Sequence, residues 1–485
     1  MYLTKQVHIP EKHPMYDYFN KLCLNANNMY NVTCFYLRQY ATAIQSFEEM
    51  KPLYENQLEI YNYVQILLGG KPYYPKGKWL NYNALDYLFK TLDDPDYYAL
   101  PGQVNQLVIK MALADFSGYF ESIKKWKKNP NGFSGMPNMP SYKKKGGKTT
   151  LKLSNQICKI KSDRFLSFPL TKQTLNIGLG CNSGVLKEVR IKPNYVGFTI
   201  DIVFEEPFDE EIILDENHNE NLLAKCKEYK TLDERALAID LGLSNLCAVV
   251  NNFGERPFLI NGNHLKSINQ MYNKNMAFYR SAAIKCNGLH YTKHMHFLTQ
   301  NRNNKIKDYI HKATTYIANY AKKHNVKIVV IGHNKLQKDE INLGKVNNQN
   351  FVIIPHNMII NQLQYKLNKA GIELLVIEES YTSQASFENL DYIPTYGVDD
   401  ENTKFTGKRI KRGLYRSNNH SPINADINGA LNIFRKAFPL VRHWDSGFVF
   451  APSIVRLNQK HHKKTRVQKT KYKSSLSGAK VQANQ

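Results

Sequence analysis

Four acidic side chains stand where a carboxylate is unusual or where a helix is expected to begin. Asp240 interrupts the apolar segment ALAIDLG, where burying an unpaired charge is unfavourable unless a cation compensates it. Glu378 and Glu379 end the apolar segment IELLVIEES, and Asp426 lies in NADINGA. Two-metal hydrolysis of a phosphodiester requires carboxylates from distant parts of a chain, which hold two Mg²⁺ ions about 3.5–4 Å apart. We therefore expect Asp240, Asp426 and one of the two glutamates to bind Mg²⁺ as the catalytic residues.

Each of these acids also has an ordinary structural interpretation. Asp240 could end a strand before a turn at Gly242, and Asp426 could cap a helix or interact with its dipole. Glu378 and Glu379 are consecutive in an extended segment, so their side chains point to opposite faces. At most one of them can easily face a metal site, and the other is expected to meet solvent or a neighbouring Lys or Arg.

The segments that carry these acids have the pattern of an α/β sheet. Apolar runs predict strands in ALAIDLGLSNLCAVV, NNFGERPFLING, KIVVIG and IELLVIEES. Helical periodicity predicts one long helix over about 264–324, a helix that ends at Gly371, and a last helix in INADINGALNIFRKAF. The predicted order is three strands, a helix, a strand, a helix, a strand and a terminal helix. This is the order of an RNase H-like fold. Such a fold is expected to bring the acids together.

The rest of the chain reads as further domains, so the expected fold class is multidomain α+β. Helical periodicity assigns residues 15–139 to a helical domain. Short alternating segments separated by turn residues predict a small antiparallel β-barrel domain over 140–225, to which residues 1–14 are added. We assign the α/β domain to 231–380 and 421–454, an insert to 381–420, and a basic, disordered tail to 455–485.

The net charge favours a polyanion as the partner. Among 485 residues, 66 Lys and Arg stand against 41 Asp and Glu, which gives +25. Such a protein attracts nucleic acids because counterions are released from their phosphates. A basic surface that serves only solubility, or a composition set by an A/T-rich genome, is the alternative. Because the chain has no signal peptide and no apolar run long enough to span a bilayer, we expect a cytoplasmic protein without membrane contact.

Two basic clusters are candidates for nucleic-acid contact. The first lies in a loop rich in Gly, Pro and Lys and contains Lys143, Lys144, Lys145 and Lys148. The second lies in the insert and contains Lys408, Arg409, Lys411, Arg412 and Arg416. Phosphate contacts of this kind position a protein on a nucleic acid. Plain solvation of a loop or a turn is the alternative for both clusters.

At these residues the chain resembles the TnpB (OrfB-type) transposon-encoded RNA-guided endonucleases, which are relatives of the type V CRISPR effector nucleases. AIDLGLSNL resembles their first RuvC motif, NADINGALNIFRKA their third, and YTSQASF the segment after their fifth strand. RIKPNYVGFTIDIVF, YYALPGQVNQLV and the RQ of YLRQY resemble parts of their wedge and helical domains. The likeness covers nearly the whole chain.

The resemblance implies a nuclease of the prokaryotic cytoplasm or nucleoid that carries a guide RNA. Such an enzyme chooses double-stranded DNA by a short target-adjacent motif and by guide pairing, and cuts both strands at one RuvC site. The domains above then correspond to a helical recognition domain, a wedge domain, a RuvC nuclease domain and a target nucleic-acid-binding insert. A channel for an RNA–DNA heteroduplex agrees with the high positive charge. No particular oligomeric state is predicted.

The chain departs from the family pattern at its second acid. Many relatives carry a Glu on the fourth strand, whereas Gly332 stands there in KIVVIGHNKLQK. In a subset that shares the wording EESYTS and GKRIKRGLY, the acid has moved to the next strand, here Glu378 or Glu379. Adjacent strands lie about 4.8 Å apart, so a Gly leaves space that a neighbouring Glu side chain can fill.

The second departure concerns zinc. Many relatives bind zinc through two C-x-x-C pairs in the insert, but the seven cysteines of this chain form no such pair and none lies in the insert. We therefore expect no structural zinc and an insert that is stabilised by apolar side chains, namely Phe387, Ile393, Tyr396, Phe405, Leu414 and Tyr415.

Two rival functions remain open. A nuclease-inactive RNA-guided repressor would bind target DNA without cutting it, although such a chain has no reason to keep both Asp240 and Asp426. A transposase of the same fold would act on transposon ends without a guide.

Overall fold

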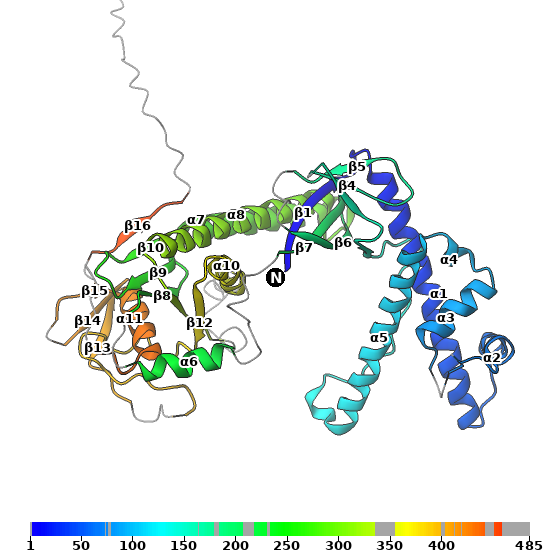
Figure 1. Ribbon diagram of the computed structural model, residues 1–485, viewed down its shortest axis with the longest axis horizontal. Coiled ribbons are helices and arrows are strands. Elements are labelled where there is room, and N and C mark those ends of the chain that lie inside the picture. Colours follow the sequence, from blue (N-terminus) through cyan, green and yellow to red (C-terminus); the bar gives the residue numbers. More distant parts are fainter. Residues whose placement is uncertain are drawn as a thin grey trace, which may run out of the picture. The chain divides into compact units, whose positions relative to one another are not determined.

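The protein is a mixed α/β chain with several sheets, which divides into two compact units in the computed structural model (Figure 1). The N-terminal unit comprises Met1–Glu210 and Tyr279–Leu298, and the C-terminal unit comprises Glu211–Phe278 and Thr299–Gln485. The structure describes residues 2–72, 74–75, 79–162, 164–178, 184–206, 218–229, 233–334, 355–398, 403–411, 413–418, 420–441 and 451–457. Within these ranges, no helix combines the length and apolar character that crossing a bilayer requires.

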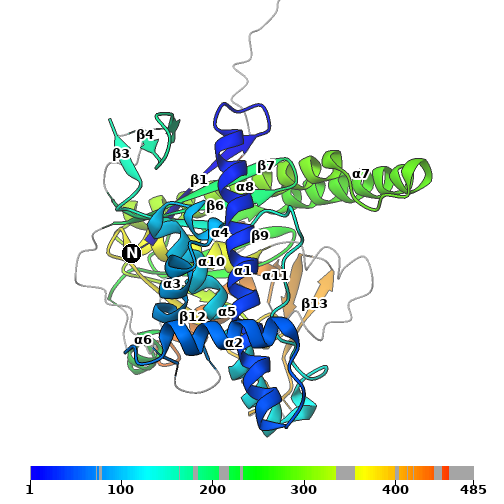
Figure 2. The ribbon, with the colours of Figure 1, turned by 90° about the vertical axis from the view of Figure 1, so that its right-hand side faces the viewer.

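The helices of the N-terminal unit share one apolar core. Those that lie between residues 16 and 128 are α1 (Tyr16–Glu48), α2 (Glu55–Leu68), α3 (Tyr82–Thr91), α4 (Pro95–Tyr98) and α5 (Gly102–Lys128). Helix α1 packs against α2 and α5, and Figure 2 shows α2 and α3 beside it. Phe89 and Phe116 are fully buried in this core, and so is Phe19, whose ring packs against Phe168 and Phe198. Helices therefore occupy much of the segment in which the sequence shows helical periodicity.

The strands of the N-terminal unit form two antiparallel sheets. One has the order β1-β7-β6-β2, and its strands are β1 (Tyr2–Pro10), β2 (Leu151–Ser154), β6 (Val185–Asn194) and β7 (Gly197–Glu205). The other consists of β3 (Lys159–Lys161), β4 (Phe165–Ser167) and β5 (Thr174–Asn176). Strand β1 pairs with β7 along its whole length. In the described residues β1 and β2 are the outer strands of their sheet and do not pair with each other. The barrel-like closure of this domain stays a prediction.

The C-terminal unit is built on a six-stranded sheet with the order β12-β11-β8-β9-β10-β16 (Figure 1). Strands β8 (Ala236–Leu241), β9 (Asn245–Asn251) and β10 (Phe258–Asn261) form an antiparallel meander. Strand β11 (Ile328–Gly332) runs parallel to β8, and β12 (Glu373–Ile377) runs parallel to β11. Strand β16 (Ser453–Val455) adds to β10 in parallel.

Helices cover both faces of this sheet, which explains why its central strands read as continuous apolar runs. On one face, α8 (Lys293–Lys323) and α10 (His356–Asn368) form a core with Leu237, Ile239 and Val329. On the other face, α11 (Ala425–Ala437) packs against β8, β9 and β11 through side chains such as Ile427 and Phe434.

The structure differs from the expected elements in three places. The single helix expected over 264–324 is a pair, α7 (Asn263–Asn287) and α8, because Gly288 adopts a left-handed φ of 68° between them. The division between the units also falls within this helix pair. Helix α6 (His218–Glu228) packs in the core of the C-terminal unit, so the boundary expected at residue 225 is displaced.

The third difference is at the C-terminus. Strand β16 ends at the start of the tail expected over 455–485, and the tail beyond residue 457 lies outside the described residues. The insert contributes β13 (Gly407–Lys411) and β14 (Leu414–Ser417), which form a small sheet with β15 (Ile423–Asn424). The remaining domain boundaries stay predictions.

The packing of α11 generates a first prediction. Phe434 is fully buried against the sheet, with its ring centroid 4.9 Å from that of Phe438. Phe434→Ala should lower the free energy of unfolding of the C-terminal unit by about 3–5 kcal/mol, because a large side chain is lost from a close-packed core. Denaturant unfolding measures this loss. Phe278→Ala, at a side chain that is 67% exposed, is the control. Equal effects of the two substitutions would contradict the packing described.

Candidate active site

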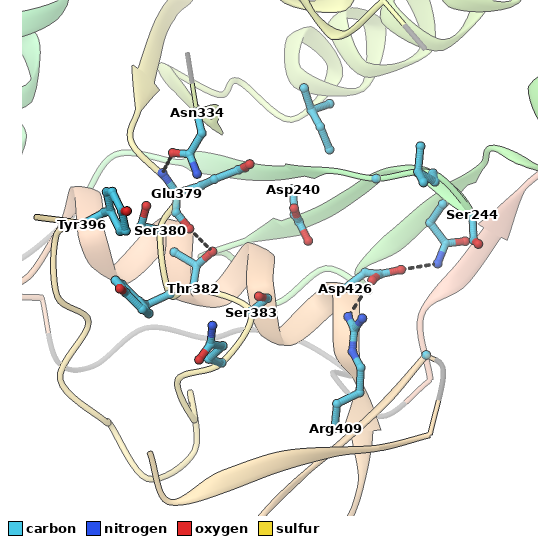
Figure 3. Close-up of a pocket in the computed structure, with 17 residues that line it drawn as sticks. Asp240, Ser244, Asn334, Glu379, Ser380, Thr382, Ser383, Tyr396, Arg409 and Asp426 are labelled. Atoms are coloured by element: carbon cyan, nitrogen blue, oxygen red, sulfur yellow. Dashed lines mark hydrogen bonds and ion pairs between the residues drawn. The ribbon is translucent and has the colours of Figure 1, made fainter. Parts of the chain in front are cut away.

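Three of the four predicted acids line one pocket of about 660 Å³. Asp240 lies near the end of β8, Glu379 follows β12 by two residues, and Asp426 lies in the first turn of α11. Figure 3 shows the Asp240 carboxylate between Glu379 and Asp426. The fold therefore brings three distant segments of the chain to one place.

The alternation of side chains along β8 explains the direction of Asp240. Leu237 and Ile239 belong to the core under α8 and α10, whereas Ala236 and Ala238 belong to the core under α11. Successive strand residues face opposite sides of a sheet, so Asp240 continues the set that faces α11. The same helix carries Asp426.

Asp240 is the acid most affected by its surroundings. Removal from water, the negative charges of Glu379 and Asp426, and to a smaller opposite degree Arg409 together hold the pKa of Asp240 well above its usual value. Three carboxylates around one pocket repel one another, so the charged form of Asp240 needs a compensating cation.

Glu378 and Glu379 have different surroundings. Glu379 continues the alternation of Leu375 and Ile377, which face α11, and it lines the pocket. Glu378 forms an ion pair with Lys436 and accepts a hydrogen bond from the Ser380 amide at 2.6 Å. Partial burial alone would raise the pKa of Glu378, but the hydrogen bonds from Lys436 and Ser380 outweigh it and lower the pKa. The second glutamate thus meets a neighbouring lysine, as the sequence pattern predicts.

The space expected at Gly332 is present. A Cβ atom at Gly332 would lie 2.8 Å from Glu379 Oε2 and 2.5 Å from Ile433 Cδ1. A Cβ atom at Gly429 of α11 would lie 2.7 Å from Asp240 Oδ2. All three distances are shorter than real Cβ contacts, so the two glycines leave room for two of the carboxylates.

Asp426 does not cap its own helix. The cap of α11 is Asn424, whose side chain accepts hydrogen bonds from the amides of Asp426 and Ile427. The Asp426 carboxylate is therefore available to other groups: Asn245 Nδ2 donates to it at 2.7 Å, and Arg409 approaches it at 3.5 Å. The first turn of a helix still favours its negative charge.

The donor set suits Mg²⁺, a hard cation that prefers carboxylate oxygens. Within the ranges that the structure describes, no three His, Cys, Asp or Glu side chains form a ready-made metal cluster. The acids therefore surround a shared pocket rather than a closed cage. Burial and, to a smaller degree, repulsion from Glu379 and Asp426 raise the pKa of Asp240, and a bound cation would favour the charged carboxylate against both effects. The carboxylates of Asp240, Glu379 and Asp426 supply suitable oxygen ligands, and the pocket that they line has room for such an ion.

Two family models match the chain. OrfB_IS605, described as a probable transposase, matches residues 214–337, and the TNB domain of Cas12f1-like proteins matches residues 356–433. The predicted resemblance to the TnpB family is confirmed. The two matched segments contain Asp240, Glu379 and Asp426.

The chain is also similar to solved type V effectors. It is 14% identical to the protein of a Cas12f1–sgRNA–target DNA complex, with a TM-score of 0.45 over 87% of this chain and 82% of that chain. It is 7% identical to CasPhi-2 (Cas12j) bound to crRNA and phosphorothioate-DNA, with a TM-score of 0.44 over 91% and 92%. No protein with curated annotation matches the sequence.

The basic residues of the insert lie on the β13–β14 hairpin. Lys408, Lys411 and Arg416 are exposed, and Lys408 lies opposite Arg416 across the two strands. Arg409 alternates to the other face, where it lines the pocket and approaches Asp426. Like charges in opposite positions are unfavourable unless an anion lies between them. Arg412 lies outside the described residues.

The loop that contains the first basic cluster, residues 143–148, is hydrogen-bonded to helix α1. Asn31 exchanges hydrogen bonds with the Lys143 backbone at 2.8 and 3.0 Å, and Asn27 donates to the Lys144 carbonyl at 3.0 Å. The Lys143 ammonium lies 3.6 Å from the centre of the Tyr30 ring, and burial lowers its pKa. Lys144, Lys145 and Lys148 are exposed, although Lys148 also contacts the Tyr16 hydroxyl at 3.2 Å. Lys143 is therefore the least accessible of the four.

Three residues around the pocket were not found by sequence reasoning. Asn245 orients Asp426, Asn334 accepts a hydrogen bond from the Glu379 amide at 3.1 Å, and Lys436 binds Glu378. Asn245 begins β9 five residues after Asp240, and Asn334 lies two residues after Gly332. Nearness in sequence to these positions is the signal that could have found them. Lys436 lies ten positions after Asp426 and has no such signal.

The space at Gly332 generates the second prediction. Gly332→Ala should displace Glu379 or Ile433 and lower stability by about 1–3 kcal/mol, because a Cβ atom at this position would overlap both side chains. The same change should reduce any metal-dependent activity about tenfold or more, since it moves a proposed ligand. Thermal unfolding and activity assays measure both effects.

Gly118→Ala is the matched control, because a Cβ atom at Gly118 of α5 meets nothing within 4 Å. This control should be neutral or slightly stabilising. Normal stability and activity of Gly332→Ala would contradict the crowding around Glu379.

Proposed function

We propose that this protein is an RNA-guided, Mg²⁺-dependent DNA endonuclease with one RuvC-type active site. The observation that carries the proposal is the pocket lined by Asp240, Glu379 and Asp426, which come from three distant segments. Supporting it, an antiparallel meander is followed by two parallel strands with α11 packed on the central strands, which we interpret as an RNase H-like domain. The matches to the OrfB_IS605 and Cas12f1-like models agree with this interpretation.

The residues have separate roles in the proposed reaction. Asp240, Glu379 and Asp426 hold the cation, while Asn245 orients Asp426. Bound Mg²⁺ supplies an activated water and charge stabilisation at the phosphate. Arg409 lines the same pocket, so its guanidinium can bind a phosphate oxygen of the strand that enters. Water is the attacking group, and no covalent protein nucleophile is required.

The partners follow from charge and from the relatives. The net charge of +25 suits a long heteroduplex, whose backbone a protein reads by its phosphates. The Cas12f1 relative is described in complex with sgRNA and target DNA. We propose a guide RNA and double-stranded target DNA with a short adjacent motif as the partners here. Lys144, Lys145 and Lys148 of the loop, and Lys408, Lys411 and Arg416 of the hairpin, are the proposed phosphate contacts.

Asp240→Asn tests the activity. The substitution keeps the shape of the side chain and removes its charge, so cleavage of a guide-matched DNA in Mg²⁺ should fall more than about hundredfold. Co-purification of guide RNA and binding of target DNA should stay within about twofold, since most of the proposed phosphate contacts lie outside the pocket. Gel-based cleavage and mobility-shift assays measure the two effects.

Asp308→Asn is the control, at an exposed acid of α8. Unchanged cleavage by Asp240→Asn would overturn the active-site assignment. Tight RNA-dependent binding without cleavage by the wild-type protein would instead identify the inactive repressor.

The two glutamates generate a further prediction. Glu379→Gln should abolish cleavage, because it neutralises a carboxylate in the pocket. Glu378→Gln should retain cleavage within about tenfold, because Glu378 binds Lys436 rather than the pocket. Single-turnover cleavage rates compare the two variants. The opposite order of effects would show that Glu378 is the ligand.

A further inference from the structure

Helix α11 presents a second set of functional side chains, apart from Asp426. Asn428, Asn432, Arg435 and Lys436 are spaced four, three and one positions apart, so they form one stripe along the helix. All four donate hydrogen bonds to the segment 378–394, which begins with the two glutamates and leads into the insert. We call these four residues the α11 clamp.

The central contacts of the α11 clamp are buried amide hydrogen bonds. Asn428 donates to the Ala385 carbonyl at 2.8 Å, and Asn432 donates to the Thr382 and Ala385 carbonyls at 2.9 and 2.7 Å. Both asparagines are fully buried. Removing one partner of a buried hydrogen bond leaves the other unsatisfied, so the loss of either asparagine should destabilise this region. They hold the course of residues 382–385.

Lys436 is the residue of the α11 clamp that contacts the segment next to Glu379. Its ammonium binds the Glu378 carboxylate, and it lies 3.4 Å from the Ser380 carbonyl and 3.3 Å from the Pro394 carbonyl. The Lys436 side chain is 15% exposed. The residues before and after Glu379 are therefore both held by one cation.

The backbone of Glu379 is also held from the opposite side. Its amide donates to Asn334 Oδ1 at 3.1 Å, and Asn334 follows β11. Lys436 and Asn334 together fix the peptide that carries Glu379, while Gly332 leaves the space into which the side chain extends. Asn334 and Ser380 also line the pocket, whereas Lys436 is not among its lining residues.

We propose that Lys436 is a positioning residue for the metal site, which acts through Glu378 and the Ser380 carbonyl to hold Glu379 at the pocket. The inference rests on the proposed function and extends it to a residue that touches neither metal nor nucleic acid. Helix α11 then sets two ligands at once: Asp426 directly, and Glu379 through Lys436 about 15 Å further along the helix axis.

Mn²⁺ binding to the full-length protein tests this role without any nucleic acid. The free Mn²⁺ is measured by electron paramagnetic resonance during a titration. Lys436→Met should weaken Mn²⁺ affinity about tenfold, as loss of a partner that orients a metal ligand does. Lys436→Arg keeps the cation and should restore most of the affinity. Lys312→Met, which breaks an exposed ion pair with Asp308 on α8, should leave Mn²⁺ affinity unchanged.

Coupling between Lys436 and Glu378 gives a second readout. If Lys436 acts through Glu378, the double variant Lys436→Met/Glu378→Gln should bind Mn²⁺ no more weakly than Lys436→Met alone. Hydrogen–deuterium exchange without metal should accelerate at residues 378–386 in Lys436→Met and stay unchanged in β8, which separates local displacement from unfolding. Fully additive losses, or wild-type Mn²⁺ affinity in Lys436→Met, would overturn the inference.

Asp240→Asn distinguishes this failure from failure of the proposed function. If Asp240→Asn abolishes Mn²⁺ binding and Lys436→Met does not weaken it, the metal site stands and Lys436 has no positioning role. If Asp240→Asn also binds Mn²⁺ normally, the pocket is not the metal site and the proposed function fails first.

Discussion

The close approach of helix α11 to strand β8 is the constraint on which the rest of the site depends. A single methyl group at Gly429 would come within 2.7 Å of Asp240 Oδ2, so any larger residue there would force the Asp240 carboxylate or the helix to shift. The apolar face of α11 is buried against the sheet through Ile427 and Phe434. Burial of this face offsets the repulsion between the acids, because hydrophobic contacts hold together groups that would otherwise separate. The fold thus creates a concentration of negative charge that a divalent cation is suited to neutralise.

The insert is held by contacts among its own side chains and backbone groups. The sequence predicts apolar stabilisation, and Tyr415 is indeed buried with Ile423, but Tyr396 is 73% exposed at the pocket. The stronger restraints are polar. Asp391 accepts hydrogen bonds from the amides of Ser386 and Thr406, and the α11 clamp binds the carbonyls of the same loop. The absence of structural zinc remains a prediction, and this network describes what would replace it.

Much of the site could be predicted because its elements have strong local patterns. The apolar strand around Asp240, the strand that ends at Gly332 and the helix that contains Asp426 each form where the periodicity indicates. The choice between Glu378 and Glu379 could not be made, because alternation along a strand says that two side chains face opposite sides but not which side carries α11. That information comes only from the packing of Leu375 and Ile377.

Other elements escaped prediction for different reasons. Gly288 splits a helical pattern that is otherwise continuous, since a left-handed glycine ends α7 without changing the polarity of the sequence. Strand β16 is short and pairs with β10 over a long sequence separation, so only tertiary contacts reveal it. Lys436 looks like any lysine in the last turn of a helix, where a positive charge is favourable. Its contact with Glu378 forms only because the tertiary fold brings the segment after β12 next to the end of α11.

The most direct test of the central claim is the anomalous scattering of Mn²⁺ in crystals of the protein with its guide RNA and an uncleavable target DNA. The account predicts two peaks about 3.5–4 Å apart, bounded by Asp240, Glu379 and Asp426 and adjacent to one phosphate of the target. Peaks that are absent from this pocket, or that are bound by Glu378 instead of Glu379, would contradict it.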